Sequence, residues 1–464
     1  MFRKIMIANR GEIALRIIRA CRELGIRTVI AYSEADRDSL PVKLADESIC
    51  IGPGNSTKSY LNIPNIVSAA LLTNAEAIHP GYGFLAENTS FAEICADCHI
   101  TFIGPTPQVA AIMGDKVQAR LAMDKAGLPV LPGTGILRSV GEAEQEAAKI
   151  GYPLMIKSSA GGGGRGIRMV NRKEEFVHLF TTAQSEVREA FHDDGMYLEK
   201  CVTNARHVEV QVLCDHHGNG VHLGERNCSV QRRRQKMLEE APSHLLSPKL
   251  REEICSRAIK GALSIGYRNA GTMEFLVDEK NRYYFMEMNT RLQVEHPITE
   301  AITNVDIVQE QLRIAAGDRM KLKQSDIHFT GHAIEFRITA EDITMDFRPQ
   351  TGTVEEYLPP SGPGVRVDSH LFRGYDIPPH YDSLLAKLIV WGPNREAAIA
   401  RGRRALDEFV LEGLPTTIPF HKWLLNNREF LRGEMTTTFL QDHADQWLRG
   451  AAEQPARAAA STRA

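Results

Sequence analysis

The stretch KIMIANRGEIALRIIRACRELGIRTVIAY (residues 4–32) has the pattern of a strand, a helix and a second strand. Lys4–Ala8 is a short apolar run, and Glu12–Leu24 carries apolar residues at the spacing of one helix face. A second apolar run, Thr28–Tyr32, follows it. Strands that alternate with helices in this way are typical of a doubly wound parallel α/β sheet, which we expect over residues 1–113.

The turn after the first strand argues against one common use of this fold. It reads Asn9-Arg10-Gly11-Glu12 and holds a single glycine. A dinucleotide-binding turn needs the G-x-G-x-x-G spacing, which lets the backbone approach a pyrophosphate. We therefore do not expect NAD to bind here.

A Pro/Gly-rich link at residues 127–133 marks a change of pattern. It opens a small α/β unit at about residues 131–203, which lies inside a larger mixed region at 114–316. Residues 317–446 contain mostly short strands, which indicates a mixed α+β domain. The last sixteen residues contain no Val, Ile, Leu, Met or aromatic residue, so we expect residues 447–464 to form a disordered tail.

The composition fits a globular protein of about three domains. The chain has 464 residues, of which 43% are hydrophobic and 24% charged, and its net charge is -3. A nucleic-acid-binding protein would carry a basic excess, and a membrane span would need about 18 uninterrupted apolar residues, so we expect neither a nucleic acid nor a membrane as partner. The start of the chain lacks the pattern of a signal peptide, and we expect a cytoplasmic protein.

The segment KSSAGGGGRG (Lys157–Gly166) lies between two apolar runs, Tyr152–Ile156 and Ile167–Val170. Glycines allow backbone N–H groups to approach phosphate oxygens, and Lys157 and Arg165 add positive charge. The G-K-[ST] ending of a Walker A loop is absent. The segment predicts a phosphate-binding loop, with a flexible hairpin loop as the alternative.

Two strand-like runs, Thr272–Val277 and Tyr283–Asn289, indicate a hairpin. If the hairpin is symmetric, Glu274 lies opposite Glu287, and Asn289 shares the face of Glu287. Facing carboxylates repel each other unless a cation lies between them, and oxygen ligands of this kind suit Mg²⁺ or Mn²⁺. The alternative is a solvated acidic face.

Two further segments carry candidate anion ligands. In RLQVEHP (residues 291–297), Pro297 favours extended geometry before it, which would place Arg291, Gln293 and Glu295 on one face. These groups could hold and deprotonate a small planar anion, or form a surface salt-bridge strand. The basic run QRRRQK (residues 231–236) indicates a local anion site or a solvated charge run.

These motifs, in this order, resemble the biotin carboxylase family of ATP-grasp ligases. The resemblance covers residues 1–446. It is specific because all of the motifs are collinear: Ile7–Ala14, His79–Asn88, Met113–Lys116, Gly161–Gly166, Glu225–Arg233, Glu287–His296 and Tyr381–Leu388. It implies a doubly wound N-terminal domain, a central ATP-grasp domain with a lid, and a C-terminal mixed α+β domain.

The resemblance also implies roles for individual residues. ATP would lie between lid and body. Its phosphates would be held by Lys116, Lys157 and the backbone of Gly163 and Gly164, and its adenine would be lined by Glu199, Lys200, Cys201 and Val202, with His207 and Gln231 nearby. The nucleotide site would also include Arg234, Glu274 and Glu287. The metal ligands would be Glu274, Glu287 and Asn289. Bicarbonate would contact Lys236, Arg291, Gln293 and the Val294 backbone, and the catalytic residues would be Lys236, Arg291, Glu295 and Arg337.

The implied reaction starts with Glu295 as general base on bicarbonate, which attacks the γ-phosphate of ATP and gives carboxyphosphate. That species breaks down to carbon dioxide and phosphate, phosphate deprotonates biotin, and Arg337 stabilises the enolate-like biotin. The chain departs from the family at Arg234, where histidine is common, whereas Arg337 is retained. An arginine stays charged near pH 7, unlike a histidine.

The implied partners follow from what the chain lacks. It has no Met-Lys-Met biotin-acceptor motif and no carboxyltransferase-sized region after residue 446, so we expect a separate biotin carboxyl carrier protein, separate carboxyltransferase subunits and a homodimer. Acetyl-CoA carboxylase is the expected parent complex, and a two-subunit pyruvate carboxylase or another acyl-CoA or 2-oxoacid carboxylase is the alternative. Another ATP-grasp ligase and an inactive nucleotide-binding regulator are the competing functions.

Overall fold

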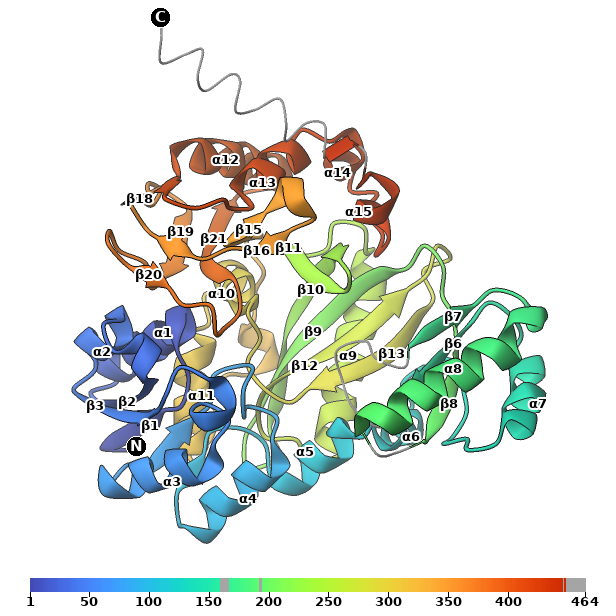
Figure 1. Ribbon diagram of the computed structural model, residues 1–464, viewed down its shortest axis with the longest axis horizontal. Helices are drawn as coiled ribbons and strands as arrows, with labels where there is room; N and C mark the ends of the chain where they lie inside the picture. The colour runs from blue at the N-terminus through green and yellow to red at the C-terminus, as the bar shows by residue number, and fades with distance from the viewer. Residues whose placement is uncertain (159–166, 192–193, 445, 448–464) are drawn as a thin grey trace, which may run out of the picture.

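The computed structural model describes residues 1–158, 167–191, 194–444 and 446–447. Figure 1 shows an N-terminal unit, a long central sheet, a small unit that projects from one side of this sheet, and a C-terminal unit at its other end. This arrangement confirms the predicted mixed α/β class. None of the described helices is long and apolar enough to cross a membrane.

The N-terminal unit is a parallel sheet in the order β3-β2-β1-β4-β5, with helices on both faces. Along β1 the side chains alternate: Ile5 and Ile7 pack with α1, whereas Met6 and Ala8 pack with α3 and α4. A strand buried on both faces is apolar throughout, which is why this segment has no polar alternation. The elements are β1 (Lys4–Ile7), α1 (Gly11–Glu23), β2 (Arg27–Ser33), α2 (Leu40–Leu44), β3 (Glu47–Gly52), α3 (Ile63–Leu72), β4 (Ala77–His79), α4 (Thr89–Asp97), β5 (Thr101–Phe102) and α5 (Pro107–Gly114).

The projecting unit is an antiparallel sheet in the order β7-β6-β8, which packs against α7 and α8 through its own apolar core. Its elements are α7 (Val140–Ile150), β6 (Leu154–Ser158), β7 (Arg168–Val170), α8 (Lys173–Phe191) and β8 (Met196–Lys200). Helix α6 (Lys116–Lys125) precedes it. The glycine loop between β6 and β7 lies outside the described residues, apart from Lys157 and Ser158.

The central sheet has eight strands in the order β13-β12-β9-β10-β11-β14-β21-β19, all antiparallel. It continues without a break across the expected domain boundary at residues 316–317, because β11 pairs with β14. Its strands and the helices that cover it are β9 (Arg206–Cys214), β10 (Gly220–Arg232), β11 (Gln235–Ala241), α9 (Pro248–Ser264), β12 (Asn269–Val277), β13 (Tyr283–Asn289), α10 (His296–Thr303), α11 (Ile307–Ala315), β14 (His332–Thr339), β19 (Val365–Ser369) and β21 (Leu384–Gly392).

Among its described residues, the C-terminal unit adds short strand pairs and four α-helices at the end of the sheet formed by β14, β21 and β19. They are β15 (Glu341–Asp342), β16 (Arg348–Pro349), β17 (Gly352–Thr353), β18 (Glu356–Leu358), β20 (Asp376–Ile377), β22 (Val410–Glu412), α12 (Arg395–Glu408), α13 (Ile418–Leu424), α14 (Arg428–Arg432) and α15 (Phe439–Asp442). Trp447 is buried against Phe347 and Phe420, so the packed chain extends one residue beyond the predicted boundary at 446. The rest of the expected tail lies outside the described residues.

Candidate active site

A cavity of about 520 Å³ lies between the projecting unit and the central sheet. This volume is in the range of small-molecule sites. Every candidate site residue that the structure describes lines it: Lys116, Lys157, Glu199, Lys200, Cys201, Val202, His207, Gln231, Arg234, Lys236, Glu274, Glu287, Asn289, Arg291, Gln293, Val294, Glu295 and Arg337. Gly163 and Gly164 lie outside the described residues.

A row of charged side chains crosses four strands of the sheet, at this cavity and next to it. Glu274 of β12 is opposite Glu287 of β13 on one side and Glu209 of β9 on the other. Glu209 is in turn opposite Arg226 of β10. The predicted pairing of Glu274 with Glu287 is confirmed. Nearer the turn, a bulge shifts the register by one residue, so the hairpin is not symmetric throughout.

Glu274 is buried and surrounded by donors. Its Oε1 accepts hydrogen bonds from Asn289 (2.8 Å) and Gln293 (2.9 Å), and Lys236 Nζ lies 3.1 Å from it. His207 Nε2 lies 3.0 Å from Oε2. Burial alone would raise the pKa of Glu274, but Lys236 and His207 hold it well below its ordinary value. The carboxylate is therefore ionised, which is the form that binds a cation.

The neighbouring Glu287 is half-exposed and faces Lys116, whose Nζ lies 3.4 Å from Oε2. With Glu274 and Asn289 it forms an all-oxygen donor set at one corner of the cavity, which fits Mg²⁺ or Mn²⁺. A second cluster of possible ligands, His207, Glu209 and Glu274, includes a nitrogen and suits these hard cations less well.

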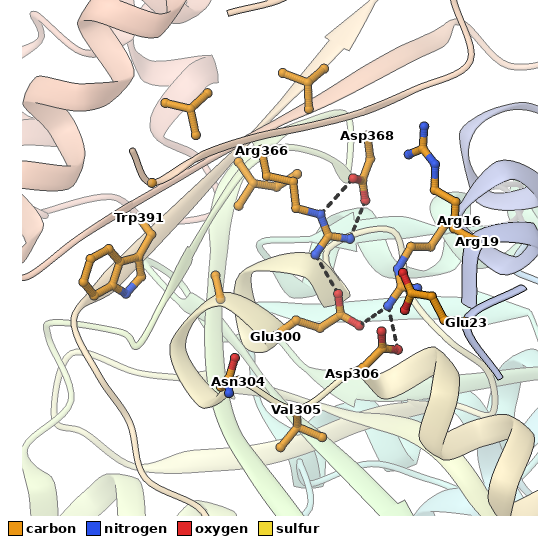
Figure 2. Close-up of a pocket in the computed structure, with 15 residues that line it drawn as sticks. Arg16, Arg19, Glu23, Glu300, Asn304, Val305, Asp306, Arg366, Asp368 and Trp391 are labelled. Carbon is orange, nitrogen blue, oxygen red and sulfur yellow. Dashed lines mark hydrogen bonds and ion pairs between the residues drawn. The ribbon is translucent and has the colours of Figure 1, made fainter. Parts of the chain in front are cut away.

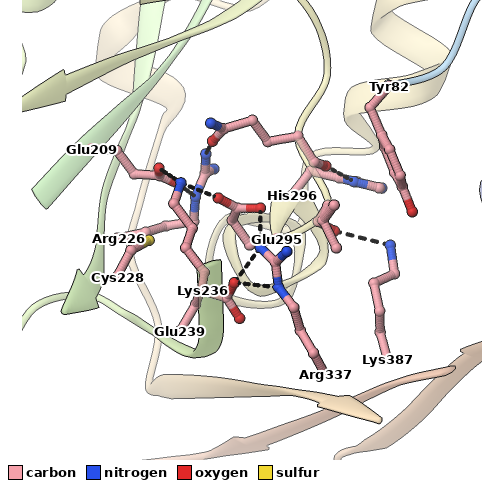
Figure 3. Close-up of polar contacts among 12 residues, drawn as sticks. Tyr82, Glu209, Arg226, Cys228, Lys236, Glu239, Glu295, His296, Arg337 and Lys387 are labelled. Atoms are coloured by element: carbon pink, nitrogen blue, oxygen red, sulfur yellow. Dashed lines mark hydrogen bonds and ion pairs between the residues drawn. The ribbon is translucent and has the colours of Figure 1, made fainter. Parts of the chain in front are cut away.

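Glu295 lies between two cations, as Figure 3 shows. Lys236 Nζ is 2.6 Å from Oε1, and Arg337 donates to Oε2 over 2.9 Å. Burial would raise the pKa of Glu295, but Lys236 and Arg337 hold it well below its ordinary value. Lys236 also contacts Glu209, and its carboxylate partners raise its pKa although burial lowers it. The site thus presents a carboxylate base between two fixed positive charges.

The predicted extended run from Arg291 to Glu295 is wrong. Val294 and Glu295 form a turn, and His296 begins α10 with Pro297 in its first turn. Proline is favoured at this position because the first helical N–H groups have no intrahelical acceptor. Arg291, Gln293 and Glu295 still line one cavity, because the turn brings them together.

Other candidates lie on the far side of the cavity. Residues Glu199–Val202 form the strand end and link beside β6, where the Lys157 ammonium contacts the Glu199 carboxylate. The ammonium of Lys200 binds the carbonyls of Gly151 and Tyr152, so its charge is already engaged within the projecting unit.

The residues of the basic run 231–236 make three separate sets of contacts. Gln231 bonds to His207, and Lys236 contacts the glutamates. Arg232 and Arg233 pair with Asp346, which leaves Arg234 exposed at the cavity. The solvated-run interpretation therefore fits only part of the segment.

Sequence reasoning missed three buried charged residues next to the site: Glu209, Arg226 and Lys387. One signal was available for Glu209, because His207, Glu209 and Gln211 alternate with valines along β9. Polar residues at every second position of a buried strand indicate a polar face inside the protein.

A second cavity, of about 650 Å³, lies between α1, α10 and β19 (Figure 2). It contains none of the candidate site residues. Arg16 contacts Glu300 and Asp306, and Arg366 contacts Glu300 and Asp368, so these acids and bases are already paired.

Known proteins match this chain along nearly its full length. Three family models match it: "Biotin carboxylase, N-terminal domain" at residues 1–110, "Carbamoyl-phosphate synthase L chain, ATP binding domain" at 115–323, and "Biotin carboxylase C-terminal domain" at 335–442. A biotin carboxylase from Nostoc sp. is 57% identical over 442 residues, which are 95% of this chain and 99% of that protein.

Solved structures of biotin carboxylases are also similar to this chain over nearly its full length. The biotin carboxylase domain dimer of Hydrogenobacter thermophilus 2-oxoglutarate carboxylase, in complex with MgADP, ADP and bicarbonate, has a TM-score of 0.92 and 51% identity, and covers 96% of this chain and 99% of that one. The biotin carboxylase subunit of a pyruvate carboxylase has a TM-score of 0.84 and 49% identity, with coverages of 96% and 99%.

The fold and the matched ATP-binding domain define an ATP-dependent ligase. The chain belongs to the biotin carboxylase family.

Proposed function

We propose that this chain carboxylates biotin on a separate carrier protein, using ATP and bicarbonate, as the biotin carboxylase component of a multi-subunit carboxylase. One observation carries the proposal: Glu295 is an ionised carboxylate held between Lys236 and Arg337, in the same cavity as the facing pair Glu274 and Glu287. A base, an anion-binding cation and a cation-binding corner are the three parts that this chemistry needs.

The proposed nucleotide site uses both walls of the cavity. Lys116 and Lys157 would bind the phosphates, together with Gly163 and Gly164, and Glu199–Val202 would line the adenine with Gln231 and His207 nearby. Glu274, Glu287 and Asn289 would hold Mg²⁺ or Mn²⁺, which neutralises phosphate charge when it is bound. Arg234 adds a permanent positive charge near the nucleotide.

The proposed chemistry begins at Glu295. Bicarbonate, held by Lys236, Arg291, Gln293 and the Val294 backbone, would lose its proton to the Glu295 carboxylate. Its oxygen would then attack the γ-phosphorus, with ADP as leaving group, to give carboxyphosphate. Carboxyphosphate would break down to carbon dioxide and phosphate, and phosphate would take the proton of the biotin N–H. The biotin nitrogen would attack carbon dioxide while Arg337 stabilises the negative charge on biotin.

We propose acetyl-CoA carboxylase, and hence fatty acid synthesis, as the parent system, with a biotin carboxyl carrier protein, carboxyltransferase subunits, a homodimeric state and a cytoplasmic location. Three functional units at 1–113, 114–316 and 317–446 belong to the same proposal. A 2-oxoacid carboxylase is the second candidate, because two structures similar to this chain come from a 2-oxoglutarate and a pyruvate carboxylase. Reconstitution with carrier and carboxyltransferase proteins of each type, followed by carboxyl transfer to acetyl-CoA or to a 2-oxoacid, separates the two.

Phosphate release from Mg-ATP tests the central reaction. We expect release to require bicarbonate, to increase with free biotin, and to be lost in Glu295→Gln, which keeps the shape of the side chain but removes the base. Release that is independent of bicarbonate, or unaffected by biotin, contradicts the proposal and favours another ATP-grasp ligase. A protein that binds Mg-ATP without any turnover would instead be the inactive regulator.

A further inference from the structure

Lys387 is a fully buried lysine that the proposed chemistry does not use. It lies on β21, in the motif Tyr381–Leu388, and its side chain has no exposed surface. A buried ammonium is costly unless it is paired, so its partners indicate why it is there. Its Nζ donates to the carbonyl of Val294 over 2.9 Å and lies 3.1 Å from the Glu12 carboxylate. Figure 3 shows Lys387 beside the turn that carries Glu295.

The partner carboxylate comes from the other end of the chain. Glu12 lies in the first turn of α1 and is itself buried. The hydroxyl of Tyr82, which follows β4, donates to the same Glu12 oxygen that Lys387 contacts. The Lys387 ammonium also lies 5.9 Å from the centre of the Tyr82 ring, within cation–π range. Two segments of the N-terminal unit therefore fix the direction in which this lysine points.

The sheet supplies the other side of the lysine's surroundings. Lys387 is opposite Arg337 of β14 and opposite Asp368 of β19, so all three lie on one face. Two neighbouring cations repel each other unless each has its own acceptor. Here Arg337 contacts Glu239 and Glu295, whereas Lys387 contacts Val294 and Glu12.

The contact with Val294 acts directly on the proposed base. The Val294 carbonyl and the Glu295 nitrogen belong to one planar peptide unit. A hydrogen bond that holds this carbonyl therefore also holds the backbone nitrogen of Glu295. Glu295 has no side-chain cap bond at the start of α10, and the turn that contains Val294 and Glu295 belongs to no strand of the sheet. The lysine thus orients the turn Gln293–Glu295, which the ladder hydrogen bonds do not hold.

We propose that Lys387, held by Glu12 and Tyr82, is a positioning residue for the turn Gln293–Glu295. The bicarbonate site then forms only when the N-terminal unit and β21 are packed together against this turn. This inference rests on the proposed function. It also gives a physical reason for three motif residues that contact neither nucleotide nor metal ligands.

Steady-state kinetics of Lys387→Met, which keeps the length of the side chain but removes its charge and donor, tests the proposal. We expect the KM for bicarbonate to rise about tenfold or more and kcat to fall, because a buried carbonyl loses a charged donor. The KM for Mg-ATP should change less than about twofold, since the contacts of Lys387 among the described residues include none of those proposed to bind ATP. Lys149→Gln, at an exposed lysine of α7, is the control and should leave both values unchanged.

Two milder variants keep the proposal testable if Lys387→Met does not fold. Tyr82→Phe and Glu12→Gln should raise the KM for bicarbonate in the same direction by a smaller factor. An unchanged KM for bicarbonate in the folded variants, or equal changes in both KM values, overturns the positioning role. If the unmodified protein releases phosphate without any need for bicarbonate, the proposed function fails first, and the positioning role fails with it.

Discussion

Arg226 gives the sharpest prediction about how the site is held together. Its guanidinium has no exposed surface and lies 2.6 Å from Glu209. It also donates to four neutral acceptors: Gln211 (2.8 Å), Thr299 (2.9 Å), Thr272 (3.2 Å) and Gln293 (2.9 Å). Figure 3 shows this arginine together with Glu209 and Lys236.

Replacing Arg226 with methionine keeps much of the volume and removes every one of these donors. Glu209 would stay buried with Lys236 as its remaining charged partner among the described residues. Breaking one side of a buried ion pair costs about 3–5 kcal/mol, because the other charge is left uncompensated. We therefore expect Arg226→Met to lower the free energy of unfolding by about 3–5 kcal/mol. Turnover should also fall, since Gln293 loses its anchor.

Urea unfolding followed by circular dichroism measures this change, with Arg257→Met as control. Arg257 is 42% exposed and lies 3.3 Å from Glu253, so its loss should change the free energy by less than about 0.5 kcal/mol. Adding Glu209→Gln to Arg226→Met removes the carboxylate that has lost its guanidinium partner, and the double variant should be less destabilised than the sum of the singles by about 0.5–3 kcal/mol. An Arg226→Met protein within about 1 kcal/mol of the unmodified chain refutes the reasoning.

Three other measurements follow from the structure. Arg234→His should make the KM for Mg-ATP rise as pH increases from about 6 to 8, because imidazole loses its charge there and guanidinium does not; identical pH profiles would contradict this. Burial lowers the pKa of His421 from its ordinary 6.5 to about 4. As the pH falls from 6.5 to about 4, the unfolded chain therefore binds a proton at this residue that the folded chain does not bind. Stability should therefore fall as pH falls, by up to about 1.4 kcal/mol per pH unit from this group, and His421→Gln should flatten the urea-midpoint profile over this range. Burial raises the pKa of Cys21 and Cys95 to about 12, so a thiol reagent at about pH 8 should modify exposed Cys50 quickly and these two only on unfolding.

Local patterns in the sequence were enough for the parts of the fold that depend on periodicity. The predicted strands at Lys4–Ala8 and Thr28–Tyr32 match β1 and β2, and the pairing of Glu274 with Glu287 follows from counting outward from a turn. The count fails closer to the turn, where the bulge near Met286 shifts the register. Bulges depend on packing against other strands, which a single hairpin does not reveal.

The wrong and the missing predictions at the site also have physical causes. Pro297 disfavours a helical residue before it, but it is also favoured in the first turn of a helix, and here the second preference prevails. Arg226 and Lys387 could not be assigned, because their partners are distant in sequence. The resemblance to a family supplied site residues that no local pattern indicates, such as Cys201 and Val202.

The unbroken eight-stranded sheet has a consequence for how this chain tolerates change. Neighbouring strands lie about 4.8 Å apart, so main-chain hydrogen bonds fix the spacing of Glu287, Glu274, Glu209 and Arg226. Slipping β14 by one residue against β11 would carry Arg337 to the opposite face. Insertions should therefore be far more damaging inside these strands than in the segment between α11 and β14, where added length leaves the spacing of the charges intact. A chimeric enzyme joined in that segment would take β11 and β14 from different parents, so both parents must share the register of this strand pair.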